Sequence, residues 1–374
     1  SVDRTVRFRS LELVKRELSF FLENRAPQVK FVDRTFNCSR NHCQEIWQYL
    51  LDHDNGVTNF HFEISADLIT DDQLEILRQM RPGLIQLEIG VQTVNPKTVR
   101  EICRTMDLER LQRTVRAVRG FSNIHQHLDL IAGLPYEDFD SFRRSFDHVY
   151  RMRPDQLQLG FLKVLKGSPM AVLAPEYELK YHREPPYEVL STRWLSYGQI
   201  RELKKVEEMT EVYYNSSQFS NTLQEMELHC LSPFELFRSI GDYYERKGLD
   251  RISHNRLARY EILFDFLKER EPERLERYRD LLMYDLYLRE NLKSRPRFAR
   301  DQNPYKTAVR NFFTEERKNP RYLRAYGESD FRQMAKTAHV EVMGDGKMVL
   351  FDYRSRDPRT NNGLAVEVGR IKME

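Results

Sequence analysis

The most constraining feature of this sequence is a regular alternation of strand-like and helix-like segments across its first 170 residues. Strand patterns cover Val29–Asp33, Asn59–Ser65, Leu84–Val91, Gln126–Ala132 and Gln156–Lys163. Helical patterns cover Leu11–Asn24, Gln44–His53, Asp71–Met80, Leu108–Arg119 and Asp138–Met152. Strands separated by helices at this spacing are typical of βα units, which form a mostly parallel sheet. No strand pattern precedes Leu11, so a barrel built from these units would lack its first strand.

Within four of these strands polar and apolar side chains alternate, so that one face of each strand is polar. The polar faces carry His61, Glu63 and Ser65, then Gln86 and Glu88, then His125, His127 and Asp129, and finally Gln156 and Gln158. The centre of an ordinary closed βα barrel is filled with branched aliphatic side chains. A polar centre instead requires water, a polar ligand or a cofactor as its partner. The alternative is an antiparallel sheet with its polar face in solvent, although the intervening helices favour parallel order.

Charge, hydropathy and cysteine content exclude several classes of protein. The 374 residues include 60 Lys and Arg against 57 Asp and Glu, a net charge of +3. This balance gives no reason to expect nucleic acid or an anionic membrane as a partner, and the apolar runs are too short to cross a bilayer. The four cysteines form neither a disulfide framework nor a CxxC pair, which favours a reducing, cytoplasmic location. The chain begins at Ser1 without a visible signal peptide, and we interpret this end as cut or processed.

The composition changes after Pro169, which indicates further domains. A Tyr- and Glu-rich connector contains the pair Pro185-Pro186. From Ser191 to Leu292 apolar and aromatic residues recur at spacings of three and four, as in a helical bundle. Gly344-Asp345-Gly346 separates two alternating runs and predicts a β-hairpin. We therefore predict three parts: residues 1–170, a helical domain at 171–300, and a tail with a hairpin at 301–374.

Two clusters of ligand-type side chains raise the question of a metal site. His125, His127 and Asp129 could present two imidazoles and a carboxylate to the zinc ion of a barrel hydrolase. This signal is weak because such a site needs further ligands at other strand ends. Cys38, together with His42 and Cys43, has a poor spacing for zinc, and the simpler interpretation is a loop that leads into the next helix.

A third hypothesis is a nucleotide-type site at the C-terminal ends of the strands, where parallel sheets bind their ligands. The residues at or near these ends are Asp33, Glu63, Glu88, Gly90, Gln92, Asp129, Gly133, Leu162 and Lys163. Glycine permits close approach of the backbone, and carboxylates suit ribose hydroxyls and an ammonium group. An arginine binds a carboxylate through its planar fork. A ligand with all of these groups is an aminoacyl-type nucleoside.

Five segments, taken in order, carry a resemblance to a known family. They are VKFVDRTFN, FHFEISADLIT, LIQLEIGVQTVNPKTVREICR, HLDLIAGLPYEDFDSF and LQLGFLKVLKGSPM. Together they resemble the core of radical S-adenosylmethionine enzymes over about Arg4–Met170, in the branch that includes oxygen-independent coproporphyrinogen oxidases and cobalamin-binding radical enzymes. The resemblance implies an α/β fold, a partial (β/α)6 barrel here missing its first strand. The open centre of such a barrel holds S-adenosylmethionine against a [4Fe–4S] cluster.

The resemblance also implies roles for six residues in binding the cofactor. Glu63 matches the acid of the family's third strand, and Gln92 matches its cofactor-contacting glutamine. Arg104 follows twelve residues later, at the spacing of an arginine near the methionyl carboxylate. Asp129 matches the acid that holds the ribose. Ile131 is placed near the adenine, with Leu162 as a further candidate.

The chain departs from the family because it lacks the CxxxCxxC motif, whose three thiolates hold the cluster. We expect this motif and the first strand to lie upstream of Ser1 on a longer precursor. The helical region Tyr187–Leu292 resembles an uncharacterised C-terminal domain of some cobalamin-binding radical enzymes, in which a cobalamin domain also lies upstream.

The complete protein would then cleave S-adenosylmethionine to a 5′-deoxyadenosyl radical, with methyl transfer as the favoured outcome where cobalamin is bound. A small-molecule substrate is expected, and the sequence does not identify it. The alternatives are a non-catalytic nucleoside-binding module, or a metal-dependent hydrolase that uses His125, His127 and Asp129.

Overall fold

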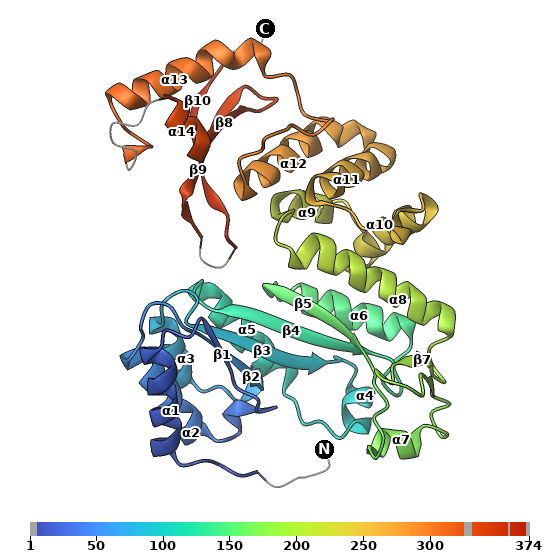
Figure 1. Ribbon diagram of the computed structural model, residues 1–374. Coiled ribbons are helices and arrows are strands. Elements are labelled where there is room, and N and C mark those ends of the chain that lie inside the picture. Colours follow the sequence, from blue (N-terminus) through green and yellow to red (C-terminus); the bar gives the residue numbers. More distant parts are fainter. Residues whose placement is uncertain (1–5, 325–330, 358–359, 372–374) are drawn as a thin grey trace. The chain divides into compact units, whose positions relative to one another are not determined.

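The computed structural model describes residues 6–324, 331–357 and 360–371 (Figure 1). The chain divides into two compact units. One comprises Ser1–Asn215 with Leu231–Arg238, and the other comprises Ser216–Cys230 with Ser239–Glu374. Among the helices within these described ranges, none is both long and apolar enough to cross a membrane.

The first unit is built on a five-stranded parallel sheet. Its strands are β1 (Gln28–Lys30), β2 (Asn59–Ile64), β3 (Ile85–Gln92), β4 (His125–Ala132) and β5 (Gln156–Phe161), in spatial order β1-β2-β3-β4-β5. All four neighbouring pairs are parallel, so the predicted α/β fold is confirmed and the antiparallel alternative is wrong. Because all five strands run parallel, their C-terminal ends lie along one edge of the sheet.

Helices connect these strands and pack on one face of the sheet (Figure 1). They are α2 (Arg40–Asp52), α3 (Asp71–Gln79), α5 (Leu108–Phe121) and α6 (Phe139–Tyr150). Two further helices are α1 (Leu11–Glu23), which precedes β1, and the short α4 (Pro96–Glu101), which follows the C-terminal end of β3. Asp107 and Asp138 cap α5 and α6 by accepting hydrogen bonds from the first-turn amides. The second helix begins at Arg40, four residues before the predicted Gln44, because the Ser39 hydroxyl accepts a hydrogen bond from the first-turn amide of His42.

The apolar faces of the strands form the core of this unit. Phe60 and Phe62 of β2 are fully buried, as are Leu87 of β3 and Leu128 of β4. The Phe62 ring also packs against the Trp47 ring of α2 in an edge-to-face arrangement. Burial of these side chains under the helices determines which face of the sheet is covered, and it leaves the polar side of each strand on the opposite face.

The remainder of the first unit follows β5. It contains α7 (Pro169–Leu173), the two-stranded sheet of β6 (Lys180–Tyr181) and β7 (Val189–Ser191), and α8 (Tyr197–Met209). A π-helical turn, Thr210–Asn215, continues α8. The Asn215 side chain accepts a hydrogen bond from the Leu157 amide and donates one to the Leu157 carbonyl, which anchors this turn to β5.

The second unit combines helices with a small antiparallel sheet. Its helices are α9 (Ser220–Glu227), α11 (Arg256–Arg270), α12 (Leu275–Arg289), α13 (Lys306–Lys318) and α14 (Phe331–Thr337), while α10 (Pro233–Arg246) contributes to both units. The strands β8 (Ala338–Val342), β9 (Lys347–Arg356) and β10 (Gly363–Arg370) are ordered β10-β9-β8. The β8–β9 pair confirms the predicted hairpin at Gly344–Gly346, and β10 is a third strand that the sequence analysis did not predict.

Candidate functional site

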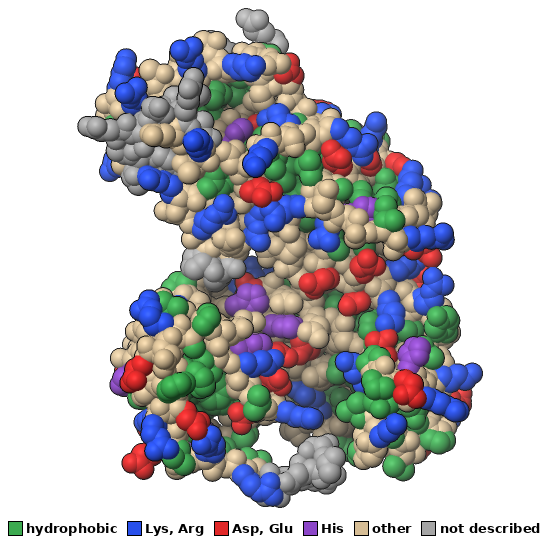
Figure 2. All heavy atoms as spheres, in the orientation of Figure 1, with side chains coloured by type: hydrophobic (Ala, Val, Ile, Leu, Met, Phe, Trp, Pro, Cys, Tyr) green, Lys and Arg blue, Asp and Glu red, His purple; other side chains and the backbone are tan. Residues whose placement is uncertain are grey.

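The polar sides of the strands form a continuous surface on the face of the sheet that the helices leave uncovered. The strand register places Glu63 beside Glu88, Glu88 beside His127, and Gly90 beside Asp129. Figure 2 shows histidine and acidic side chains gathered on this face of the first unit. His127 is only 8% exposed. The polar face inferred from the alternation along the strands is therefore present.

The strand β3 ends in a corner formed by Gly90 and Gln92. A register irregularity separates these two residues, and Gln92 has a φ of 70°, in the left-handed region that non-glycine residues rarely adopt. Arg104, which follows α4, donates a hydrogen bond from Nη2 to the Gly90 carbonyl. A Cβ atom at Gly90 would collide with the side-chain amide of Gln92 and displace it. Glycine therefore leaves room for the side chains of Gln92 and Arg104, two of the predicted cofactor ligands, to lie close together.

Asp129 lies across from this corner, in β4. Its Oδ1 lies 3.0 Å from Nε2 of His127. Burial by itself lowers the pKa of His127, but the adjacent Asp129 carboxylate outweighs it and raises this pKa above the ordinary value. Burial lowers the pKa of Arg104, and the charges of Asp67 and Asp129 act against that decrease. Asp129 therefore acts electrostatically on both His127 and Arg104.

Glu63 and Glu88 form the acidic part of the same face, on β2 and β3. Lys30 Nζ lies 3.2 Å from Glu88 Oε2 and 3.8 Å from Glu63 Oε1, and His61 Nε2 lies 2.9 Å from Glu88 Oε2. Burial and nearby carboxylates raise the pKa of Glu63. Burial and Lys30 lower the pKa of His61 despite the opposing effect of Glu88. The face thus lowers the pKa of His61 in β2 and raises the pKa of His127 in β4.

Ile131 and Leu162 lie on the β4–β5 side of the same edge. Ile131 is across from Gly160 and shares the face of its strand with Asp129. The Leu162 amide donates a hydrogen bond to the Ala132 carbonyl at 2.9 Å, which extends the pairing beyond the end of β5. Both residues are partly exposed, and Leu162 also packs against the apolar cluster that includes Val164 and Tyr177.

The site fits an aminoacyl nucleoside such as S-adenosylmethionine. Gln92 Oε1 and Arg104 Nε are buried, yet neither has a hydrogen-bond partner among the residues that the structure describes. Buried polar atoms normally find partners, so this pair suits a ligand with its own donors and acceptors. A guanidinium group binds a carboxylate, and the carboxylates of Glu63 and Asp129 accept hydrogen bonds from hydroxyl and ammonium groups.

The four cysteines do not fit a [4Fe–4S] cluster. Cys38 and Cys103 are exposed, Cys43 is buried, and all four are free thiols. Burial, with a contribution from Cys38, raises the pKa of the Cys43 thiol far above its ordinary value. This shift opposes the thiolate form that iron binds, and the cysteine spacing is not CxxxCxxC.

The histidine pair of β4 does not assemble a metal site. In the described ranges, His125, His127 and Asp129 do not belong to a group of three ligand atoms close enough to share an ion. His125 opens the strand, at the end remote from the C-terminal edge. The hydrolase hypothesis therefore receives no support from the geometry.

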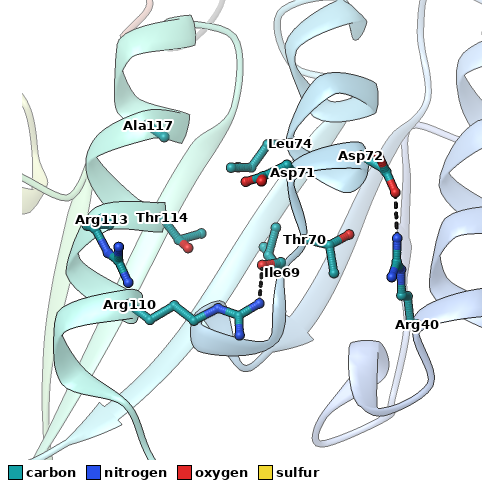
Figure 3. Close-up of a pocket in the computed structure, with 10 residues that line it drawn as sticks. All are labelled: Arg40, Ile69, Thr70, Asp71, Asp72, Leu74, Arg110, Arg113, Thr114 and Ala117. Carbon is teal, nitrogen blue, oxygen red and sulfur yellow. Dashed lines mark hydrogen bonds and ion pairs between the residues drawn. The ribbon is translucent and has the colours of Figure 1, made fainter.

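A separate cavity of about 620 Å³ opens between α3 and α5 (Figure 3). Arg110 and Arg113 line one side of it, and Asp71 and Asp72 line the other. Arg110 donates a hydrogen bond to the Ile69 carbonyl at 3.0 Å. None of the six predicted site residues lines this cavity, so it is distinct from the corner at Gly90.

The sequence analysis missed two buried carboxylates beside the corner. Asp67, 7% exposed, accepts a hydrogen bond from the Asp107 amide at 3.0 Å. Glu137 is fully buried and accepts a hydrogen bond from Thr93, the residue after Gln92. Both residues follow a strand of the parallel sheet within a few positions. That position, near the C-terminal end of a strand, could have identified them as candidates from the sequence.

Comparisons with known families match two parts of the chain. Residues 1–149 match the radical SAM superfamily, in which SAM denotes S-adenosylmethionine. Residues 175–351 match a family described as a protein of unknown function, DUF4080.

Relatives with assigned activities match only in part. An oxygen-independent coproporphyrinogen III oxidase of Pseudomonas aeruginosa is 31% identical over 110 residues, 29% of this chain and 23% of that protein. A probable threonylcarbamoyladenosine tRNA methylthiotransferase of Pyrococcus horikoshii is 31% identical over 74 residues, 20% of this chain and 17% of that protein. The chain thus spans 17–23% of the length of these two relatives.

Solved structures with a similar fold include two from this superfamily. The radical S-adenosylmethionine methyltransferase TsrM of Kitasatospora setae, with cobalamin and a [4Fe–4S] cluster bound, has a TM-score of 0.42 at 15% identity, covering 50% of this chain and 38% of that one. Coproporphyrinogen III oxidase of Escherichia coli has a TM-score of 0.37 at 19% identity, covering 52% and 46% respectively.

Proposed function

Residues 1–149 form a radical S-adenosylmethionine superfamily domain, and from this premise we propose that the chain is the cofactor-binding barrel of a radical enzyme. The observation that carries the proposal is the corner at the end of β3. There Gln92 and Arg104 meet at Gly90, across from Asp129, with buried polar atoms that lack partners among the described residues.

Each predicted residue has a role that its chemistry allows. Arg104 would bind the methionyl carboxylate through its guanidinium fork. Asp129 would accept hydrogen bonds from the ribose hydroxyls, and Glu63 would interact with the ammonium group. Ile131 and Leu162 would contact the adenine with their apolar side chains. The helices on the other face exclude water from the sheet but not from this edge, so a bound cofactor remains accessible to a substrate.

The radical reaction requires a [4Fe–4S] cluster, and the four cysteines of this chain do not fit one. When bound, S-adenosylmethionine and a reduced [4Fe–4S] cluster would supply the one-electron chemistry needed to abstract a hydrogen atom from a substrate. We propose that the complete protein takes its cluster ligands from a segment beyond these residues, and that methyl transfer is the outcome where cobalamin is also bound. A longer chain that stays colourless after incubation with iron and sulfide would favour the non-catalytic nucleoside-binding module instead.

Binding of S-adenosylmethionine to matched arginine variants tests the site assignment. Arg104→Ala removes the guanidinium at the corner, and we expect it to weaken binding at least tenfold because a charge-assisted pair with the carboxylate is lost. Arg110→Ala is the control, since Arg110 also donates to a backbone carbonyl but lines the separate cavity. Equal affinities of the two variants would mean that Arg104 does not contact the cofactor.

A further inference from the structure

A fully buried carboxyl group lies behind the corner at the end of β3. Glu137 lies in the turn between β4 and α6 and is 0% exposed. Its Oε1 accepts hydrogen bonds from the hydroxyl groups of Thr93 at 2.6 Å and Ser145 at 3.0 Å, with Ser141 at 3.5 Å. Thr93 directly follows Gln92, so one carboxylate oxygen connects the corner to the first two turns of α6.

Further hydrogen bonds join the same segments. Asn95 donates from Nδ2 to the Tyr136 carbonyl and to the Ser141 hydroxyl, each at 3.0 Å. The Thr98 hydroxyl donates to the Pro135 carbonyl at 2.9 Å. The segment after β3 is therefore tied at several points to the turn after β4, and these two segments adjoin the strands that carry Gln92 and Asp129.

The hydroxyl groups around Glu137 depend on it as their common acceptor. Thr93 Oγ1 donates to Glu137 and in turn accepts a hydrogen bond from the Asn95 amide at 2.9 Å. Ser145 Oγ likewise donates to Glu137 and accepts from the Val94 amide at 3.2 Å. Loss of the carboxyl group would leave both buried hydroxyls without this acceptor, at the point where the chain leaves the strained Gln92.

We propose that Glu137 is a positioning residue for the cofactor site. Through its hydrogen bond with Thr93, it holds the segment that follows the Gly90–Gln92 corner against the turn that contains Glu137 itself. This inference rests on the proposed function, because Gln92 is a predicted ligand of S-adenosylmethionine. Burial raises the pKa of Glu137 to about 7, against the three hydroxyl donors, which lower it. The other oxygen, Oε2, has no hydrogen-bond partner in the described part of the chain, and a proton on this oxygen would remove the buried charge while Oε1 keeps its hydroxyl donors.

Two substitutions of Glu137 separate positioning from general stability. Glu137→Gln keeps a carbonyl oxygen that can accept from Thr93 and Ser145, whereas Glu137→Ala removes the acceptor. We expect the alanine variant to bind S-adenosylmethionine about tenfold more weakly than the glutamine variant. The control is Asp285→Ala in the second unit, which removes another buried carboxylate, one that accepts from Asn221 and Thr222. We expect this control to leave the affinity unchanged.

A second measurement does not require the cofactor. Amide hydrogen exchange at Val94 and Asn95, whose N–H groups bond to Ser145 and Thr93, should be faster in Glu137→Ala than in wild type and unchanged in Asp285→Ala. If the alanine variant does not fold, Thr93→Val takes its place, because it removes the 2.6 Å hydrogen bond with little change of shape. Exchange is then read at Val94 alone, whose amide bonds to Ser145, because the Asn95 amide bonds to Thr93 itself.

The outcomes distinguish this inference from the proposed function. Weaker binding in the alanine variant, restored by glutamine and accompanied by faster exchange, supports it. A folded alanine variant with wild-type affinity and wild-type exchange overturns it. If wild-type protein binds no S-adenosylmethionine, the proposed function fails, and the exchange rates alone decide whether Glu137 holds the corner.

Discussion

The buried carboxyl of Glu137 makes a quantitative prediction about stability and pH. Its pKa rises from an ordinary value of 4.5 to about 7 in the folded chain. Because this folded-state pKa is raised, the protonated group favours folding at low pH, and that contribution is lost as the pH increases from 4.5 through about 7. At 1.36 kcal/mol for each pH unit, the loss is about 3 kcal/mol. Glu137→Gln cannot titrate, so it lacks this dependence.

The comparison uses urea unfolding of wild type and Glu137→Gln between pH 5 and pH 8. Both tryptophans, Trp47 and Trp194, lie in the first unit, so their fluorescence reports on the unfolding of the unit that contains Glu137. We expect the stability of the glutamine variant relative to wild type to increase by about 2–3 kcal/mol across this range. Other titrating groups are common to both proteins and cancel in the difference. Parallel curves would refute the reasoning, because they would mean that Glu137 does not titrate near neutral pH.

Two other substitutions test the local geometry. Gly133→Ala should destabilise the first unit by about 1–3 kcal/mol in urea unfolding, because Gly133 has a φ of 90° and a Cβ there would lie 2.7 Å from Cγ1 of Val189. Gly120→Ala, in α5 with open space around it, should instead raise stability by about 0.5–1 kcal/mol, and similar losses in both variants would contradict this. Asp129→Asn should lower the pKa of His127, measured by NMR titration of the imidazole, because it removes the charge that raises it; an unchanged pKa would show that the two side chains do not interact in solution.

The arrangement of the sheet could be predicted because it follows from local patterns. Alternation along a strand reports which side chains share a face, and the helices between strands imply parallel order. The polar stripe of Glu63, Glu88, His127 and Asp129 was therefore predictable without knowledge of the register. The register adds that these side chains from three strands adjoin one another.

Other features depend on contacts that the sequence does not display. The third strand of the second unit, Gly363–Arg370, is interrupted by register irregularities after Gly363 and after Glu367, which break the two-residue period that predicts a strand. Glu137 resembles an ordinary acidic residue of a turn, and its burial arises only when Thr93 and Ser145 meet it from elsewhere in the chain. The contact of Arg104 with the Gly90 carbonyl likewise depends on the chain returning to β3 after α4.

The proposal that this chain binds S-adenosylmethionine at the corner of β3 is tested most directly by calorimetric titration of the whole chain with that compound. We expect saturable binding at one site, and weaker binding of 5′-methylthioadenosine, which lacks the carboxylate and ammonium groups. Arg104→Ala should remove most of the difference between the two ligands, since the guanidinium is the proposed partner of the carboxylate. Absence of any saturable heat with S-adenosylmethionine, from folded protein at millimolar ligand, would contradict the account.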